Sequence, residues 1–267
     1  MKSSSIDILA CPICHHALQL QRESDTRIEK GILECGQCGS SYPIQHGIPQ
    51  FIQANTLLGY NRRFSHLYDW FSWVYRPFSR AAFAYIGMGE EEGRREITDR
   101  LEPYGGRVLE VSIGPGVNLP YLVGRPDVGE VYGLDISPGQ LQRCQALTRK
   151  KGWQVDLFLG NAEQLPFRYD VFDGVFHVGG INFFNDQKAA IDEMIRVARP
   201  GAKILIADET EKGASGYEKI LPGFKKSFTG KRPPVVPPIS LVPQEMLETR
   251  LFEVWKGWLY CIEFRKP

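Results

Sequence analysis

The sequence predicts an α/β protein, with a doubly wound, mostly parallel sheet preceded by a small N-terminal module built on four cysteines. Two observations support this fold class. From about residue 90 onward, short runs of β-branched residues alternate with helical patterns, which is typical of parallel strands joined by crossover helices. Before that, two Cys-x-x-C pairs stand close together, which is typical of a metal-stabilised module.

Composition and charge exclude several classes of protein. The 267 residues are 43% hydrophobic and 24% charged, which supports a packed core and suits about two domains. The net charge of +1 lacks the basic excess that many dedicated nucleic-acid binders carry. The sequence has neither an apolar run of about 18 residues nor the apolar core of a signal peptide, so we expect a cytoplasmic protein without a transmembrane segment.

The first predicted element is the cysteine module, which we expect to span residues 1–54. Its two pairs are separated by 20 residues and match the spacing of a four-thiolate zinc site with the ligands Cys11, Cys14, Cys35 and Cys38. Zinc would hold together about 50 residues that bury too little apolar surface to fold alone. The alternatives are disulfides, which a reducing cytosol disfavours, and a redox pair, which would need one motif rather than two.

Other cysteines and histidines are weaker candidates for metal ligands. Three histidines flank the pairs and could replace a cysteine, although four thiolates already close a structural site: His15, His16 and His46. Cys144 and Cys261 lie far away in amphipathic stretches, and we expect both to be buried apolar residues.

An aromatic segment at residues 55–89 is expected to form a helical linker or lid. Residues 60–78 are dense in aromatic side chains and contain the pair Tyr68-Asp69. One interpretation is a lid that closes over a ligand, and another is a helix packed between two domains. A third is a nucleic-acid surface, with Arg62 and Arg63 on phosphates and aromatic rings stacked on bases.

The larger domain is expected at residues 90–267. We predict its strands in five β-branched runs, at residues 107–111, 131–134, 155–159, 172–178 and 203–207. Helices fall between them. The clearest is expected from Asp186 to Arg199, because apolar residues recur there at i, i+3, i+4 and i+7 and Pro200-Gly201 stops the run.

A glycine-bearing turn follows the first of these strands and is expected to lead into a helix. It runs from Glu110 to Leu119 and contains Ser112, Gly114 and Gly116. Glycines let the backbone approach a ligand closely, and a helix N-terminus directs N–H groups at it. A dinucleotide fingerprint would need a third glycine where Leu119 stands. The alternative is that it is only a tight structural turn, so alone it is weak evidence for a ligand site.

Polar residues end the next strands. Asp135 ends the second strand, the position from which a carboxylate reaches ribose hydroxyls in doubly wound folds, and the alternative is that it caps the helix expected near Pro138. Asn161 follows the third strand, and His177 ends the fourth. His177 is a candidate general base, with pocket lining and core packing as the alternatives.

The C-terminal part is less regular. Residues 213–241 are rich in glycine, lysine and proline, and we expect an extended flap on the substrate side, with a solvated basic loop as the alternative. The chain then closes with a helix expected at residues 243–250 and two β-rich runs around residues 255–258, which predict a terminal hairpin.

The N-terminal module resembles the zinc ribbon of the small activator subunits that pair with tRNA, rRNA and release-factor methyltransferases. The resemblance covers about residues 6–54, and its motifs are Leu9-Ala10-Cys11-Pro12-Ile13-Cys14, Leu33-Glu34-Cys35-Gly36-Gln37-Cys38-Gly39, Tyr42-Pro43-Ile44 and Gly47-Ile48-Pro49. In that family the ribbon is a scaffold. The resemblance therefore implies a metal-binding role, with a protein partner through the ribbon as an open alternative.

About residues 60–210 resemble the class I S-adenosylmethionine (SAM)-dependent methyltransferases of type 11, which have a seven-stranded Rossmann-like sheet. The motifs stand in the family's order: residues 110–119, Asp135, residues 160–167 and residues 170–177. The resemblance implies the following SAM contacts: Glu110, Ser112, Gly114 and Gly116 at the methionine part, Asp135 and Ile136 at the ribose, and Asn161 and Ala162 at the adenine. It also implies that Tyr68 closes over SAM from the lid and that His177 lines the methyl-transfer pocket. Ser112 and Asn161 depart from the family's usual Gly and Asp.

These resemblances imply a SAM-dependent methyltransferase with an attached zinc ribbon. Residues 179–186, followed by 193–201, are similar to the corresponding stretch of ubiquinone and menaquinone biosynthesis C-methyltransferases, except that Ile181 replaces an Arg. The similarity implies a small apolar or aromatic acceptor, quinone-like or lipid-like. The alternatives are a methyltransferase acting on rRNA or tRNA and a catalytically silent partner subunit. Methyl transfer from a sulfonium needs alignment of donor and acceptor and no covalent nucleophile. The catalytic candidate is therefore a general base, His177.

Overall fold

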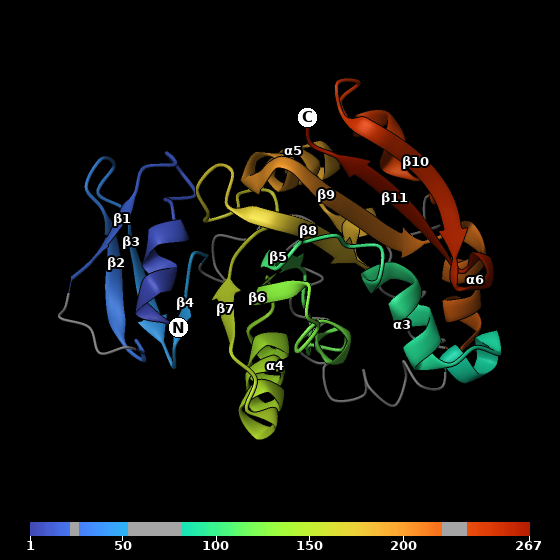
Figure 1. Ribbon diagram of the computed structural model, residues 1–267, viewed down its shortest axis with the longest axis horizontal. Helices are drawn as coiled ribbons and strands as arrows, with labels where there is room; N and C mark the ends of the chain where they lie inside the picture. The colour runs from blue at the N-terminus through green and yellow to red at the C-terminus, as the bar shows by residue number, and fades with distance from the viewer. Residues whose placement is uncertain (22–26, 53–81, 221–233) are drawn as a thin grey trace.

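The computed structural model describes residues 1–21, 27–52, 82–220 and 234–267 (Figure 1). These residues build a small antiparallel sheet at the N-terminus and a seven-stranded sheet beside it. No helix in the described ranges is both long enough and apolar enough to cross a membrane.

The large sheet has the strand order β10-β11-β9-β8-β5-β6-β7. Its parallel strands are β5 (Gly106–Val111), β6 (Val128–Asp135), β7 (Val155–Leu159), β8 (Phe172–Val178) and β9 (Ala198–Glu209). Two antiparallel strands, β11 (Leu259–Arg265) and β10 (Leu247–Val254), continue the sheet beyond β9. The mostly parallel, seven-stranded sheet that the sequence predicts is confirmed, and so is the terminal hairpin.

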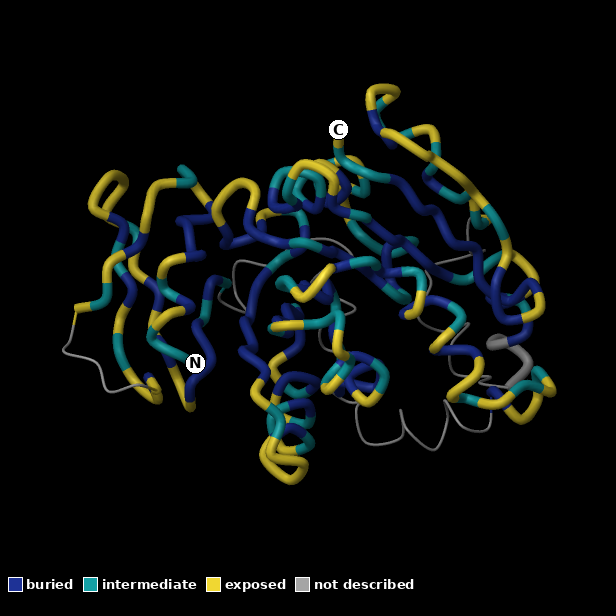
Figure 2. Tube along the Cα trace, viewed as in Figure 1, coloured by how far each residue is buried: buried dark blue, intermediate teal, exposed yellow. Residues whose placement is uncertain are grey.

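Helices cover both faces of this sheet. On one face, α3 (Glu90–Thr98) and α4 (Pro138–Lys151) pack over a core cluster that includes Val108. On the other, α5 (Gln187–Val197) packs over a cluster that includes Leu109. Successive residues of a strand point to opposite faces, and both faces are apolar, as buried parallel strands require. Figure 2 shows the strands as a buried layer between helices whose outer sides are exposed.

Capping side chains fix where α4 and α5 begin. Ser137 Oγ accepts a hydrogen bond from Gln140 N at 3.2 Å, and Asp186 Oδ1 accepts one from Ala189 N at 2.9 Å. α4 ends at Gly152, whose φ of 68° suits glycine. The helix predicted from Asp186 is therefore confirmed, with Asp186 as its cap. Asp135 is not the cap of α4, because Ser137 fills that position.

The helix predicted at residues 243–250 is wrong. Residues from Leu247 onward form β10, which pairs with β11 from Arg250 opposite Glu263 to Val254 opposite Leu259. Most of β10 is exposed, as expected of a strand at the sheet edge. Pairing with the apolar β11 outweighs the weak helical preference of this polar stretch.

The extended flap predicted at residues 213–241 is wrong in its first part. α6 (Glu211–Ile220) occupies residues 213–220, and a short 3-10 turn covers Pro238–Leu241. Gly213 and Gly216 allow the helix to approach Trp258, since an added Cβ would lie 2.1 Å from its carbonyl oxygen and 2.2 Å from its ring, respectively. Residues 221–233 lie outside the described ranges.

The small N-terminal sheet has the order β1-β2-β3-β4 and is antiparallel throughout. It follows a 3-10 turn and comprises β1 (Leu18–Leu20), β2 (Gly31–Cys35), β3 (Ser41–Gln45) and β4 (Ile48–Pro49). We refer to residues 1–21 and 27–52 as the ribbon. In Figure 1 it lies beside β7, the edge strand of the large sheet.

Backbone hydrogen bonds join the ribbon to that edge. Phe51 N donates to Leu159 O at 2.8 Å, and Gln50 forms a parallel bridge with Leu159 at the carboxyl end of β7. Ala10 N, next to the first cysteine, donates to Pro166 O at 3.0 Å. The ribbon therefore adds a short strand segment to β7 and also holds the loop that follows it.

Candidate functional site

The candidate site lies at the carboxyl ends of the parallel strands. From β5, the chain continues to β6 and β7 on one side and later to β8 and β9 on the other, so the strand order reverses between β5 and β8. Ligands of doubly wound folds bind at such a reversal point. Glu110 and Val111 end β5, Asp135 ends β6, and His177 lies near the end of β8.

The turn after β5 has a left-handed backbone at three positions. φ is 61° at Ser112, 56° at Gly114 and 76° at Gly116. A Cβ on Gly116 would lie 2.8 Å from Cys144 Sγ, whereas one on Gly114 would meet nothing within 4 Å. Gly116 therefore serves close packing, and Gly114 borders open space. The related methyltransferases usually have glycine at position 112. The left-handed backbone of Ser112 gives the physical reason, because glycine adopts this conformation more easily than serine does.

The helix expected after this turn is a three-residue 3-10 turn, η3 (Leu119–Tyr121). The turns between Ser112 and Leu122 instead close on themselves through backbone hydrogen bonds such as Gly116 N to Ile113 O at 3.1 Å. A helix this short contributes no appreciable dipole. A ligand at this turn would therefore meet its backbone N–H groups and neighbouring side chains rather than a helix dipole.

Asp135 closes the turn from the neighbouring strand. Its Oδ2 accepts a hydrogen bond from Gly114 N at 2.7 Å, and its Oδ1 accepts one from Ser137 N at 2.9 Å. The side chain is buried. The structure therefore places Asp135 against the Gly114 turn, with Ile136 between Asp135 and Ser137, the cap of α4.

Glu110 is almost completely buried, with 1% of its surface accessible. Its Oε1 accepts a hydrogen bond from Asn118 Nδ2 at 2.6 Å, while Oε2 has no partner among the described residues. Burial raises the pKa of Glu110 to about 8, against the opposing effects of the Asn118 hydrogen bond and the positive charge of Arg94. The carboxyl group is thus largely neutral at pH 7.

Asn118 and Arg94 belong to this cluster, although sequence reasoning assigned neither of them a role. Arg94 Nη1 donates to Asn118 Oδ1 at 2.8 Å. Asn118 stands in the same turn as Gly114 and Gly116, so its position was a usable signal. Arg94 stands in a charged helix 16 residues before Glu110, and nothing in the sequence distinguishes it from Arg95.

The residues expected at the adenine follow β7. Asn161 Oδ1 accepts a hydrogen bond from Glu163 N at 3.1 Å, so this oxygen shapes the turn that follows the strand. Ala162 is buried and belongs to the same core cluster as Leu9, Cys11 and Phe51 of the ribbon. The loop that follows β7 is therefore packed directly against the ribbon.

His177 is fully buried and has a fixed tautomer. Its Nδ1 lies 3.0 Å from Val111 O, and because a carbonyl only accepts, Nδ1 carries the hydrogen. Nε2 is then an acceptor, and it has no partner within the described ranges. Burial lowers the pKa of His177 below its usual range, despite the opposing charge of Asp208, so the ring is neutral. The ring of Phe184 lies edge-on to it at 5.3 Å.

A second network holds the loop after β8. Asp208, at the end of β9, accepts hydrogen bonds from Gly180 N at 3.1 Å and from Asn182 N at 2.7 Å. Tyr260 of β11 donates its hydroxyl hydrogen to Asn182 Oδ1 at 2.9 Å. These contacts tie the loop that carries Phe184 to the antiparallel end of the sheet. Sequence reasoning assigned Asp208 and Tyr260 no role, because their partners lie far away in the sequence.

Tyr68 and the lid expected at residues 60–78 lie outside the described residues. The structure brings the other predicted SAM contacts together at the carboxyl ends of the strands. They are Glu110, Ser112, Gly114, Gly116, Asp135, Ile136, Asn161, Ala162 and His177.

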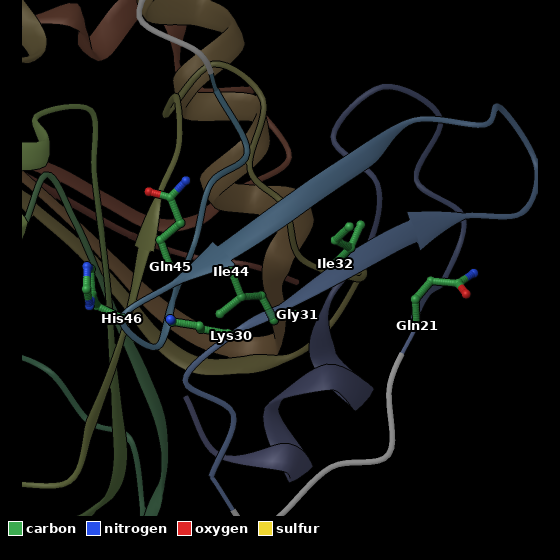
Figure 3. Close-up of a pocket in the computed structure, with 7 residues that line it drawn as sticks. All are labelled: Gln21, Lys30, Gly31, Ile32, Ile44, Gln45 and His46. Atoms are coloured by element: carbon green, nitrogen blue, oxygen red, sulfur yellow. The ribbon is translucent and has the colours of Figure 1, made fainter.

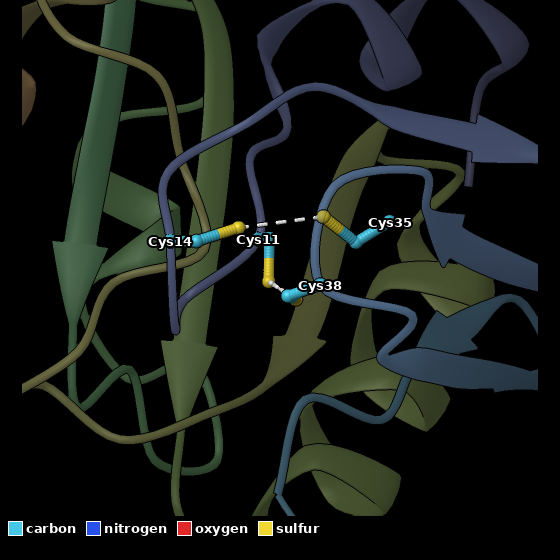
Figure 4. A group of neighbouring side chains, drawn as sticks. All are labelled: Cys11, Cys14, Cys35 and Cys38. Carbon is cyan, nitrogen blue, oxygen red and sulfur yellow. Dashed lines mark hydrogen bonds between the residues drawn. The ribbon is translucent and has the colours of Figure 1, made fainter.

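The four predicted metal ligands form one cluster in the ribbon (Figure 4). Their Sγ atoms all lie within 4.8 Å of one another, with Cys11 to Cys38 at 3.6 Å and Cys14 to Cys35 at 3.4 Å. Four sulfurs placed tetrahedrally at about 2.3 Å from a zinc ion would lie about 3.8 Å apart. None of the six cysteines is disulfide-bonded, and Cys144 and Cys261 are buried in apolar surroundings, as predicted.

The two cysteine pairs have matching backbone structures. His15 N donates to Cys11 O at 2.8 Å, and Gly39 N donates to Cys35 O at 2.9 Å. Both donors have a left-handed backbone, with φ values of 58° and 72°. Each pair therefore forms the same tight turn, which directs two thiols to one side. The donor set fits a structural zinc ion with four thiolate ligands.

A hollow of about 430 Å³ lies on the ribbon itself (Figure 3). It is lined by Gln21, Lys30, Gly31, Ile32, Ile44, Gln45 and His46. It shares no residue with the strand-end cluster or with the four cysteines. We therefore assign it no role in cofactor or metal binding.

Comparison with known families places two domains in the chain. Residues 109–206 match the family model described as a methyltransferase domain. Residues 4–47 match the Trm112p-like protein family. The first match contains the strand-end cluster from Glu110 to His177, and the second contains all four cysteines.

Individual relatives match about half of this chain. An uncharacterized protein of Mycobacterium tuberculosis is 38% identical over 133 residues, which are 49% of this chain and 47% of that protein. An O-methyltransferase of Aspergillus nomiae is 30% identical over 146 residues, covering 54% and 64%. A demethylmenaquinone methyltransferase of Renibacterium salmoninarum is 34% identical over 127 residues, covering 46% and 50%. The chain thus spans about half the length of the first of these curated relatives.

The fold has counterparts among solved structures. A SAM-dependent methyltransferase from Thermotoga maritima superposes with a TM-score of 0.53 over 74% of this chain and 98% of that chain, at 19% identity. At that level of identity the likeness shows the fold alone. It confirms the Rossmann-like methyltransferase architecture that the sequence predicts.

Proposed function

We propose that this chain, in which a methyltransferase domain follows a Trm112p-like ribbon, transfers the methyl group of SAM to a small apolar or aromatic acceptor. The supporting observation is the cluster at the strand-order reversal, where Glu110, the Gly114 turn and Asp135 stand together with buried polar atoms. We assign residues 90–267 to catalysis and residues 1–54 to the zinc ribbon.

The chain's own residues would bind and orient the cofactor. Glu110 would take the amino group of the methionine part, with Ser112, Gly114 and Gly116 beside it. Asp135 and Ile136 would take the ribose, Asn161 and Ala162 the adenine, and Tyr68 the lid position. When bound, SAM supplies an electrophilic methyl group on a sulfonium. The protein then has to align donor and acceptor and exclude water.

His177 is the proposed contact on the acceptor side. Its unprotonated Nε2 can accept a hydrogen bond, and can take a proton from an acceptor hydroxyl at near-neutral pH. The ring of Phe184 adds an apolar wall. This combination suits an aromatic acceptor with a polar group, such as a quinone-like or phenolic ring. Among the relatives, the name of the demethylmenaquinone methyltransferase gives a quinone-class acceptor, and the name of the O-methyltransferase gives transfer to an oxygen atom.

Zinc at Cys11, Cys14, Cys35 and Cys38 would have a structural role. The cluster is remote in sequence from every proposed SAM contact, and four thiolates leave no open coordination position for a substrate. The metal would fix the ribbon, whose Ala10 contacts the loop after β7. A protein partner on the remaining ribbon surface is compatible with the Trm112p-like match.

The test uses methyl-labelled SAM with the purified, zinc-loaded protein and a cell extract, and then separates organic, RNA and protein fractions. Label in the organic fraction, reduced with Asp135→Ala at SAM concentrations below saturation, is the expected result. Label in RNA would replace the acceptor class with a nucleic acid. SAM binding without any label would point to a water-soluble acceptor. Failure to bind SAM would contradict the proposal and favour a silent partner subunit.

A further inference from the structure

Three buried polar side chains form a chain of hydrogen bonds from α3 to the end of β5. Arg94 Nη1 donates to Asn118 Oδ1 at 2.8 Å, and Asn118 Nδ2 donates to Glu110 Oε1 at 2.6 Å. Their exposed fractions are 3%, 3% and 1%. Burying a guanidinium and a carboxyl group costs free energy that well-packed apolar side chains would avoid. The chain of hydrogen bonds therefore calls for a function other than stability.

The order of donors makes the chain directional. A guanidinium group can only donate, so the Asn118 amide must turn its oxygen to Arg94 and its nitrogen to Glu110. The amide nitrogen in turn needs an acceptor, which is Glu110 Oε1. Oε2 is then the oxygen left without a partner among the described residues. Arg94 thus fixes the Asn118 amide with its nitrogen towards Glu110, so that one carboxyl oxygen is held and the other stays available.

Arg94 is itself held on several sides. Its guanidinium carbon lies 5.5 Å from the ring centre of Phe83 and 5.8 Å from that of Trp255. Its Nε lies 3.1 Å from Glu90 Oε1, one helical turn earlier. Trp255 Nε1 donates to Gly93 O at 2.6 Å, which fixes the tryptophan against α3. The guanidinium therefore has one well-defined orientation.

We propose that Arg94 and Asn118 are positioning residues for the methyl donor, which hold the Glu110 carboxyl group so that Oε2 is kept for the donor's ammonium group. This inference rests on the proposed function. It follows that α3, which carries Arg94, contributes to cofactor binding. The terminal hairpin contributes as well, because Trp255 packs against Arg94. Neither residue is proposed to touch the reacting atoms.

The charge of Glu110 gives the proposal a measurable signature. Burial raises its pKa to about 8, while the Asn118 hydrogen bond and the Arg94 charge lower it and Asp135 raises it. Cys144 of α4 and His177 of β8 are the other titratable groups nearby, and Glu90 is paired with Arg94. An ammonium group favours the ionised carboxylate. SAM affinity should therefore rise about tenfold per pH unit towards pH 8 and should fall again at higher pH, where the ammonium group of SAM loses its own proton.

The experiment is calorimetric titration of the zinc-loaded protein with SAM between pH 6 and 10. In Arg94→Met, the pH of highest affinity should move upward by about half a pH unit, because the loss of a nearby positive charge raises the pKa of Glu110 by about one unit while the pKa of the SAM ammonium group is unchanged. The matched control is Arg95→Met, on the same helix, whose Nε lies 3.0 Å from Glu91 Oε1 in the same kind of pair but is exposed. The control should keep the wild-type profile.

Each outcome decides between the alternatives. If Arg94→Met weakens SAM binding by the same factor at every pH, the plot of affinity against pH does not move. The role of Arg94 would then be structural only, and the proposal would be overturned. If Arg94→Met does not fold, Asn118→Ala makes the same test, because it removes the donor to Oε1 and should also move the profile upward. Absence of SAM binding by the wild-type protein at every pH would instead overturn the proposed function.

Discussion

Replacing Glu110 by glutamine should make the protein more stable, and increasingly so as the pH rises. Glutamine keeps the shape of the side chain and an acceptor for Asn118, but it cannot ionise. In the wild-type protein, a carboxyl group with a pKa of about 8 is kept neutral, whereas in the unfolded chain it ionises near pH 4.5. Folding then requires the uptake of a proton.

The magnitude follows from the two pKa values. A raised folded-state pKa means that the unfolded chain binds fewer protons, so the wild-type protein loses stability between about pH 4.5 and about pH 8. At pH 7 the loss is 2.5 pH units times about 1.4 kcal/mol, or at most about 3.5 kcal/mol. The variant should gain up to this amount. A gain of that size would raise the melting temperature of a protein this long by about 8 °C.

The assay is urea unfolding of wild-type, Glu110→Gln and Glu245→Gln protein at pH 5, 6, 7 and 8, with zinc present and SAM absent. Glu245 is exposed and serves as the control. The gain of Glu110→Gln should be small at pH 5 and grow with each step, while Glu245→Gln should follow the wild-type protein. A gain that stays constant with pH, or a loss of stability, would refute the reasoning about burial.

Four further predictions concern the turn, the cofactor, the base and the metal. Ser112→Gly should raise the free energy of unfolding by up to about 1 kcal/mol, since φ is 61° there, and an unchanged urea midpoint would contradict this. Asp135→Ala should weaken SAM binding by ~1 to 3 kcal/mol in calorimetry, and unchanged affinity would remove Asp135 from the site. If His177 is the base, His177→Ala should reduce turnover at saturating SAM far more than SAM affinity, so near-normal turnover would exclude that role. Cys38→Ser should lower the zinc content below one ion per chain by elemental analysis and should weaken SAM binding, because the ribbon holds the loop of Asn161; full zinc content would argue against the four-thiolate site.

The parallel strands were predictable because each is a short run of apolar residues bounded by turns. The run at residues 155–159, for example, is buried along its whole length. β10 could not be recognised in the same way, because an edge strand is largely exposed and its pairing with β11 is a tertiary contact. α6 was hidden by Gly213 and Gly216, which usually interrupt helices but here make room for Trp258.

The candidate site was predictable where its residues are close in sequence. Glu110, Gly114 and Gly116 share one turn, and the four cysteines share two short motifs. Arg94 was not predictable, since its role depends on α3 packing against the β5 turn and Trp255. Asp208 was hidden for the same reason: its partners follow β8, and its place at the end of β9 makes no local pattern.

The ribbon and the sheet edge that it covers belong to one chain, which fixes their ratio at one to one. β7 is an outermost strand, and an uncovered edge strand is a template for pairing with other polypeptides. Covalent attachment holds the ribbon next to β7 at an effective concentration of about 1 mM. A free ribbon protein present at far lower concentration would compete poorly for this edge. The fraction of molecules whose β7 edge is covered therefore does not depend on the supply of a second subunit.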